Sequence, residues 1–427
     1  MSTATQQRDT YLLDLLAQAE QAAKASPLQL AELRAAARAM VHERSFPSNR
    51  DEDWRFTDLS AMLSTAYAAA QAAPSTEALR SHLAPLCLPD ALTLVFVNGH
   101  YAPALSTVDS LPGITVAPLS QCDRDSRSYL GRVSGSSEVF TALNTAGFAD
   151  AAVIWVEKNQ AVEPPIQIIY LTTEAAALVQ PRCLVVAEPN SAVTLVEQFS
   201  GLGSNFINSV TELWLQDGAQ VSHMRIQQDS EATYHVGKTA VAQARDSRYV
   251  STAVSLGGKL ARHHLEVYQT GPQTDTQLNG LSAIRGSQLA DTHSLIALSY
   301  PHGSANQLQK NIVDERAHAV FNGRVYVPHE AQLTNAAQLN RNLLLSEKAR
   351  VDTKPELDIV ADNVKCAHGA TVSQLQADEL FYLQSRGIDA GQAQRLLLYA
   401  FAMEILEKIE IPALQDRLAQ HLTEWTT

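Results

Sequence analysis

Three short segments decide the fold: Asn190-Ser191-Ala192-Val193, Gly218-Ala219-Gln220-Val221 and Ser247-Arg248-Tyr249-Val250. Each begins with a polar turn, continues with a small or apolar residue and ends on a β-branched residue. They recur at steps of roughly 28 to 31 residues, which is typical of stacked repeats. After a phase break the pattern resumes at Gly258–Leu260, Ser287–Leu289, His318–Val320 and Lys348–Val351. A β-solenoid is therefore predicted, with a jelly roll or other double-sheet domain as the alternative.

The region around these repeats, residues 151–372, contains one short apolar segment after another, separated by turns. The segments with the clearest strand pattern are Ala152–Val156, Ile166–Leu171, Leu184–Ala187, Val193–Glu197 and Thr211–Leu215. No long helical pattern interrupts them, so a βαβ fold is disfavoured. We expect residues 151–372 to form the β-helix core.

The N-terminal region, residues 1–150, is predicted to be mainly helical because apolar residues recur in it at helical spacing. Thr57 or Asp58 is expected to cap a further helix over 59–66. The apolar run Leu92–Val97, followed by Asn-Gly, instead predicts a buried strand and a tight turn.

The C-terminal region, residues 373–427, returns to the helical period. One helix is expected from Asp378, with acids in its first turn and a glycine, Gly387, after its end. Asp389 is placed to cap the next helix, and Pro412 fits the first turn of a last one.

The composition indicates a folded, acidic protein. The 427 residues are 45% hydrophobic and 18% charged, with a formal net charge of −13. Such a balance argues against a disordered chain and against binding to nucleic acid. No apolar run approaches the ~20 residues of a membrane span, and the first residues lack the pattern of a secretion signal. We therefore expect a cytoplasmic protein without a membrane or nucleic-acid partner.

The four cysteines are far apart in the sequence and form no Cys-x-x-Cys pair. A disulfide framework and a self-contained zinc or cluster site on paired cysteines are therefore not expected. Cys87, Cys122 and Cys183 are interpreted as small apolar fillers.

The remaining cysteine, Cys366, is followed two residues later by His368. On a strand both would project from one face, about 6.5–7 Å apart, and both could reach iron or a cluster. Lys365 and His368 could also lower the pKa of the thiol. Two ligands cannot close a tetrahedral site, so others would have to come from elsewhere in the chain or from a partner. The alternative is a buried structural cysteine beside a hydrogen-bonded histidine.

Other candidate residues have weaker support. His263 and His264 would point to opposite faces of a strand, so they are not expected to share a metal. Asp275, Asp291 and Asp314 are the carboxylates that a carbohydrate-active β-helix enzyme could use, but their spacing places no two together. The segment 53–56, with Trp54, fits either a docking segment or a local turn that this ring anchors.

Signatures of nucleotide binding and serine hydrolysis are missing from the sequence. There is no Gly-x-x-x-x-Gly-Lys-Ser/Thr loop, no Gly-x-Gly-x-x-Gly after a strand and no Gly-x-Ser-x-Gly elbow. The pattern favours a non-catalytic scaffold.

Two blocks resemble a known family. KPELDIVADNVKCAHGATV (354–372), continued by LFYLQSRGI (380–388), is similar to the signature shared by SufB and SufD proteins, and RDEDWRFTDL (50–59) resembles the N-terminal block of the SufD branch. The chain length and the lack of a cysteine-rich N-terminal motif also favour that branch. The clear resemblance covers the N-terminal block and roughly residues 280–410.

This resemblance implies a right-handed parallel β-helix flanked by N- and C-terminal helices. It also implies a scaffold role in the SUF iron–sulfur cluster assembly complex, together with SufB and the ATPase SufC. Cys366 and His368 would lie at the SufB–SufD interface, where a transient cluster forms, and no cofactor would be bound tightly. The ATPase would dock on the C-terminal helices, at Asp378, Glu379, Phe381, Tyr382, Arg386 and Phe401. The isolated chain is expected to form a homodimer through edge strands.

Overall fold

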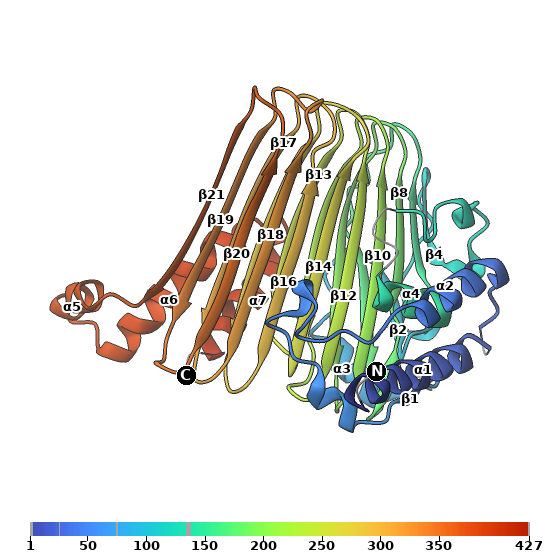
Figure 1. Cartoon of the computed structure of the whole chain (residues 1–427), viewed down its shortest axis with the longest axis horizontal. Coiled ribbons are helices and arrows are strands. Elements are labelled where there is room, and N and C mark those ends of the chain that lie inside the picture. The colour runs from blue at the N-terminus through green and yellow to red at the C-terminus, as the bar shows by residue number, and fades with distance from the viewer. Residues whose placement is uncertain (1–2, 25, 74–75, 134–137, 426–427) are drawn as a thin grey trace.

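Parallel strands stacked in two facing sheets make up most of the chain (Figure 1). The computed structural model describes residues 3–24, 26–73, 76–133 and 138–425. Within them the strands form a β-solenoid of about 8 turns, with α-helices toward both ends of the chain. The predicted fold class is confirmed, and the jelly-roll alternative is wrong because neighbouring core strands run parallel.

The strands alternate between the two sheets along the chain. Sheet A contains β4 (Ile114–Pro118), β5 (Ala152–Val156), β8 (Arg182–Ala187), β10 (Phe206–Leu215), β12 (Tyr234–Gln243), β14 (Leu260–Gln269), β16 (Leu289–Ala297), β18 (His318–Val327) and β20 (Arg350–Ile359), with β1 (Ala68–Ala69) and β7 (Ala177–Val179) at its side. Sheet B contains β3 (His100–Tyr101), β2 (Leu92–Val97), β6 (Ile166–Thr172), β9 (Ala192–Gly201), β11 (Gln220–Gln228), β13 (Arg248–Ser255), β15 (Asp275–Ile284), β17 (Ser304–Val313), β19 (Asn335–Leu344) and β21 (Lys365–Gln374). Both sheets thus include strands from residues 1–150.

The strand register explains the repeat that the sequence displays. Val193 pairs with Val221, which pairs with Tyr249, so successive coils repeat every 28 residues here. The expected match of Val250 with Val221 is therefore off by one residue. The phase break before Leu260 is the change from sheet B to sheet A, because the first three segments begin strands of one sheet and the next four begin strands of the other.

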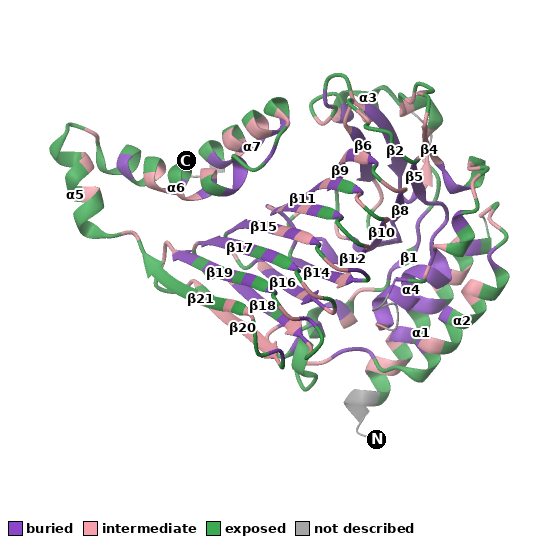
Figure 2. Ribbon diagram, turned by 90° about the horizontal axis from the view of Figure 1, so that it is seen from above, coloured by how far each residue is buried: buried purple, intermediate pink, exposed green. Residues whose placement is uncertain are grey.

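Helices cover the outer face of each sheet (Figure 2). The N-terminal helices α1 (Thr3–Lys24) and α4 (Val139–Gly147) share an apolar cluster with sheet A, to which α2 (Ala31–Glu43) contributes. The C-terminal helices α6 (Ala390–Leu406) and α7 (Pro412–Trp425) pack on the outer face of sheet B. The remaining helices are α3 (Glu77–Leu83) and α5 (Ala377–Ser385), with short 3-10 helices η1 (Glu52–Trp54), η2 (Ser60–Ser64), η3 (Pro103–Leu105), η4 (Leu119–Gln121) and η5 (Ser126–Ser128).

Helix caps follow the sequence in the C-terminal region but not at the N-terminal block. Asp389 caps α6 by accepting a hydrogen bond from the Gln392 N–H, as predicted. The helix expected over 59–66 is wrong, because only η2 forms there. Asp58 Oδ1 accepts from the N–H of Ser60, 2.9 Å away, and so stabilises a local turn.

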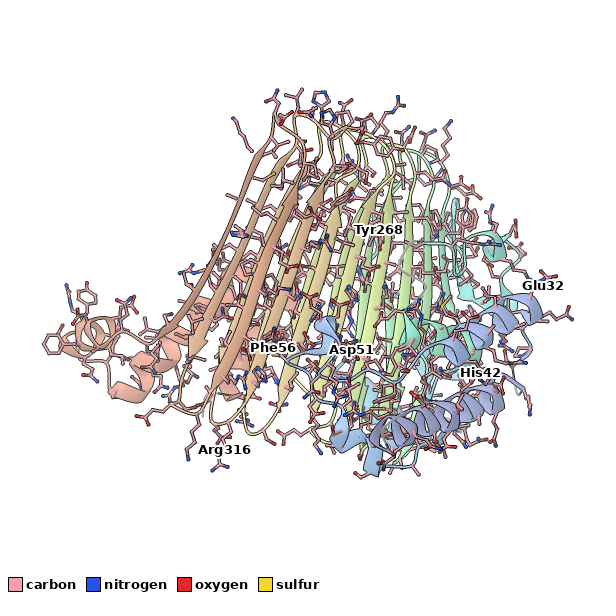
Figure 3. All side chains as sticks on the ribbon, viewed as in Figure 1. Glu32, His42, Asp51, Phe56, Tyr268 and Arg316 are labelled. Carbon is pink, nitrogen blue, oxygen red and sulfur yellow. The ribbon has the colours of Figure 1, made fainter. Side chains whose placement is uncertain are left out.

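The N-terminal block 50–59 lies across the outer face of sheet A, where Figure 3 labels Asp51 and Phe56. Trp54 is buried, with the Arg262 guanidinium 4.0 Å from the centre of its ring. Arg262 forms a buried ion pair with Asp291, which also accepts from the Thr57 hydroxyl. Of the two interpretations of this segment, the anchored turn is the one observed.

Ionisable side chains are buried between the sheets as well. Nε2 of His223 lies 2.9 Å from Glu197 Oε2, and Nδ1 of His235 lies 2.7 Å from Asp229 Oδ2. The guanidinium of Arg225 lies 2.8 Å from Nε2 of His235 and can only donate. The ring proton of neutral His235 is therefore on Nδ1, facing Asp229.

The two ends of the solenoid are finished differently. At the N-terminal end, β3 pairs antiparallel with β2 and β4 pairs antiparallel with β5. At the C-terminal end, β20 and β21 each pair with one strand only within the described residues. No helix among these residues is long and apolar enough to cross a membrane.

The buried histidines predict that stability falls in mild acid. Burial lowers the pKa of His235 and, with the neighbouring Arg225, the pKa of His263. The unfolded chain protonates these residues near pH 6.5, whereas the folded chain keeps them neutral to lower pH. Stability is therefore present above pH 6.5 and is lost as the pH falls below it, by up to ~1.4 kcal/mol per pH unit for each histidine.

Urea titrations between pH 5 and 8 measure this slope. His263→Gln should reduce it, because glutamine can keep the hydrogen bond to Thr239 but takes up no proton. The exposed His329 provides the matched control, as His329→Gln. Equal slopes for the two variants would contradict the prediction.

Candidate functional site at the open end of the solenoid

The free edges of β20 and β21 define the C-terminal end of the solenoid. The Lys365 N–H donates to Thr334 O and the Arg350 N–H to Ala317 O, at 2.9 and 3.0 Å. Since successive residues of a strand direct their backbone groups to opposite sides, every second residue of each strand points these groups outward. Pro355 occupies such an outward position, so its missing N–H costs no ladder bond.

Cys366 and His368 lie on β21 and face the space between the sheets. They pair with Ala336 and Gln338, which are both buried in that interior. Cys366 is half-buried and packs against the core cluster. His368 is exposed because no further coil covers it. The structure thus brings the two predicted ligands to one side of one strand.

The expectation that Lys365 and His368 favour the thiolate is wrong. The pKa of Cys366 is raised, chiefly because burial disfavours the charged form, although the Ala336 backbone acts in the opposite direction. Lys365 is exposed and, as the adjacent residue, projects from the other face of β21.

Cys366 and His368 alone do not complete a metal site. Cys366 and His368 supply two side chains, and the described residues hold no group of three or more His, Cys, Asp or Glu side chains suited to one metal ion. A cluster held here would take its other ligands from outside this group.

A chain of amides behind His368 was missed by the sequence interpretation. Gln338 Nε2 donates to Gln307 Oε1, and Gln307 Nε2 donates to Ser294 Oγ, each at 2.8 Å. Gln338 and His368 are in-register neighbours 30 residues apart. Continuing the first three segments along sheet B, through β15 and β17 to β19 and β21, would have identified this pair.

The predicted docking residues divide into two groups. Asp378, Glu379, Phe381, Tyr382 and Arg386 are all exposed on α5 and at its C-terminal end. The side chains of Phe381 and Tyr382 are 71% and 58% exposed, which is unusual for aromatic rings. Phe401 is not part of this surface: it is half-buried on α6, with the Lys310 ammonium 4.0 Å from its ring centre.

The weaker candidates separate in the structure. His263 is buried and His264 is half-exposed, and they project from opposite faces of β14 as expected. Asp291 is paired with Arg262 on sheet A, whereas Asp275 is paired with Arg248 on sheet B.

The other three cysteines differ in burial. Cys183 is fully buried in the core, as expected of an apolar filler, and Cys122 is half-buried. The filler interpretation is wrong for Cys87, which is exposed beyond the end of α3.

An Asp–His–Ser arrangement lies inside the solenoid. Ser209 Oγ is 2.9 Å from Nε2 of His235, whose Nδ1 faces Asp229. All three side chains are at most 5% exposed, and a Cβ at Gly237 would lie only 2.8 Å from Ser209 Oγ. The hydroxyl therefore faces a filled interior and is part of the packing, not of a site open to substrate.

Two family models together cover most of the chain. The model described as SUF system FeS cluster assembly, SufBD core domain, matches residues 170–401. The model described as SufBD protein N-terminal region matches residues 5–168.

Similar proteins come from bacteria and a plant. The iron-sulfur cluster assembly SufBD family protein slr0076 of Synechocystis is 45% identical over 92% of this chain and 90% of its own length. Protein ABCI7, chloroplastic, of Arabidopsis thaliana is 35% identical over 97% of this chain and 90% of its own. The iron-sulfur cluster assembly protein SufD of Escherichia coli is 29% identical over 87% of both chains. The solenoid, the two matched regions and these relatives agree: the chain belongs to the SufBD family of iron–sulfur cluster assembly proteins.

Proposed function

We propose that this chain is a non-catalytic scaffold subunit of a cytoplasmic SUF complex. In this proposal it pairs with a SufB-type paralogue, binds the SufC ATPase, and helps to acquire iron and build new clusters at the shared interface. The observation that carries the proposal is the position of Cys366 and His368 beside two unpaired sheet edges.

The physical chemistry of that end supports a shared site. Free backbone donors and acceptors along β21 can be paired by another sheet edge, and a partner placed there could supply the missing ligands. Because burial raises the pKa of Cys366, the isolated chain holds a thiol, and iron must displace its proton on binding. We propose the cluster as a transient product at this end and not as a resident cofactor.

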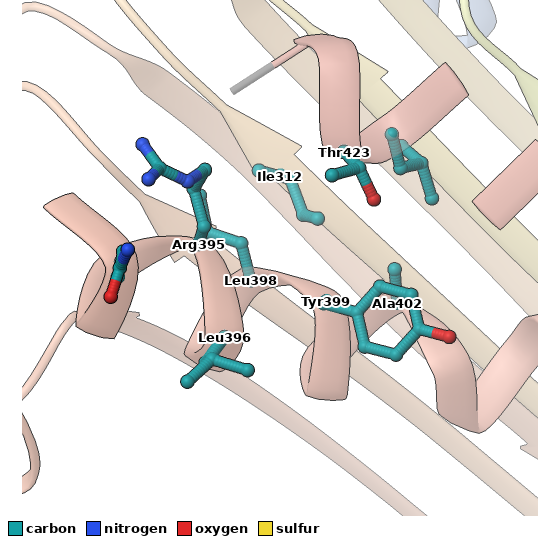
Figure 4. Close-up of a pocket in the computed structure, with 9 residues that line it drawn as sticks. Ile312, Arg395, Leu396, Leu398, Tyr399, Ala402 and Thr423 are labelled. Carbon is teal, nitrogen blue, oxygen red and sulfur yellow. The ribbon is translucent and has the colours of Figure 1, made fainter. Parts of the chain in front are cut away.

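The ATPase is proposed to bind the C-terminal helices. Figure 1 shows α5 projecting beyond the sheets, and its aromatic side chains are exposed. A cavity of about 450 Å³ lies between α6, α7 and β17 (Figure 4), with apolar walls and with Leu396 and Tyr399 exposed at its edge. An apolar surface of this kind is typical of a protein interface.

Without its paralogue, the chain is proposed to dimerise through the same free edges. A second copy can supply an edge of matching length, and a twofold axis would place the two half-sites together. The pairing is self-complementary, so it competes with the paralogue for one surface.

Cys366→Ala combined with His368→Ala should reduce cluster formation about tenfold or more, as the loss of metal ligands or their supports typically does. The measurement is iron and sulfide content after anaerobic reconstitution, with and without the ATPase and the paralogue. Cys122→Ala, a half-buried cysteine remote from the open end, serves as the control. Wild-type cluster content in the double variant would remove any direct role of the two residues.

Phe381→Ala with Tyr382→Ala should weaken ATPase binding by about 30-fold or more, because exposed aromatic anchors often contribute about 2 kcal/mol at an interface. Calorimetric titration of the full chain with the ATPase measures this. Tyr300→Ala removes a comparably exposed ring from a turn of the solenoid and should leave binding unchanged. Equal affinity of all three proteins would exclude α5 from the interface.

The purified chain should have twice its monomer mass of 46.4 kDa by light scattering. Ala370→Pro removes an outward N–H of β21 without removing a bond to β19, so it should shift the chain toward monomer. A wild-type monomer at tens of micromolar would rule out self-association through the edges.

A further inference from the structure

Gln338 is the interior neighbour of His368. The two residues are paired in register on β19 and β21, adjacent parallel strands about 4.8 Å apart. Gln338 is 3% exposed, and its Oε1 atom is buried without a hydrogen-bond partner among the described residues. His368 is the side chain that the next coil presents on the same face.

The Gln338 amide is hydrogen-bonded to the preceding coil. Its Nε2 donates to Gln307 Oε1, which also accepts from Ser294 Oγ. With the Gln307 amide in this orientation, rotating the Gln338 amide by half a turn would bring two carbonyl oxygens together. The NH₂ group therefore faces Gln307, and Oε1 is left as the acceptor. Gly323, on the opposite sheet, leaves room for the Gln338 amide, because a Cβ at this residue would collide with it.

On the same strand, the amides of Asn340 and Asn342 make hydrogen bonds to neighbouring side chains. Asn342 Nδ2 donates to Asn340 Oδ1 at 2.6 Å, and Asn311 Nδ2 donates to Asn342 Oδ1 at 2.7 Å. A buried carbonyl without a donor destabilises a fold. A hydrogen-bond donor at the open end would therefore remove the destabilisation caused by the unsatisfied Gln338 oxygen.

At the position of Gly323 in the opposite sheet, the next coil supplies no donor. Pro355 follows Gly323 in register on β20, and it has neither an N–H nor a polar side chain. His368, in contrast, always carries at least one ring N–H.

We propose that Gln338 is a positioning residue for His368. In the proposed arrangement the His368 ring turns toward Gln338, and Oε1 accepts a hydrogen bond from one ring N–H. This bond holds the imidazole in one orientation and one tautomer. The other ring nitrogen is then unprotonated and free to meet iron at the open end. This inference rests on the proposed role of His368 in cluster assembly.

The tautomer of His368 tests the proposal on the metal-free full chain. Nitrogen NMR of the chain labelled with ¹⁵N-histidine at pH 8 reports the proton position, and His368→Gln assigns the signal. One tautomer should dominate in the wild type. Gln338→Met, which keeps the side-chain length but removes the acceptor, should change the tautomer ratio about fivefold or more.

A further variant separates positioning from general packing. Gln309→Met removes an equally buried glutamine, whose in-register neighbour on β19 is Asn340, and should leave the His368 signal unchanged. Equal tautomers in the wild type, or a ratio that Gln338→Met does not alter, would overturn the proposal.

The same variants distinguish this inference from the proposed function. If His368→Ala forms clusters normally, the proposed function fails while the tautomer measurement still stands. If the tautomer is independent of Gln338 while His368→Ala abolishes clusters, the inference fails and the proposed function stands.

Discussion

In-register parallel hydrogen bonding ties each position of one coil to the same position of the next. Gln307, Gln338 and His368 form one such column, and Ala305, Ala336 and Cys366 form another. A residue's environment is therefore set by its neighbours about 30 residues away more than by those beside it in the sequence. Columns of apolar residues make the core, and columns of amides carry hydrogen bonds along the solenoid axis.

Parallel hydrogen bonding allows further coils to be added at either end of a solenoid. The two ends of this solenoid are finished differently. Antiparallel strands β3 and β4 close the N-terminal end, and helices cover the outer face of sheet A beside it. At the other end, the outward backbone groups of β20 and β21 have no partner strand within the described residues. Pro355 removes one outward N–H from the edge of β20 without removing a bond to β18. The candidate site lies at this end because the last coil leaves its interior side chains uncovered.

Much of the fold was predictable from the sequence, because its signals were local. The solenoid followed from turns and β-branched residues at a regular step, and the α6 cap followed from Asp389 and Gln392. The strand registers were harder to predict. Tyr249 and Val250 fit a β-strand pattern equally well, and only the observed hydrogen-bond pairing shows that Tyr249 is the partner of Val221. Gln338 gave no local signal, because a buried glutamine differs from an exposed one only through its distant neighbours. The expected effect of Lys365 on Cys366 failed for a related reason: adjacency along a strand places side chains on opposite faces.

The sequence by itself determined the repeating strands, the helical ends and the pairing of Cys366 with His368 on one side of a strand. These depend on periodicity and on residue types within a few positions of each other. Only the tertiary structure decided that this side faces the interior, that burial raises the pKa of Cys366, and that the buried Gln338 is the in-register neighbour of His368. Those properties depend on which coils are stacked and where the stack stops, and the contacts that decide them join residues about one coil apart.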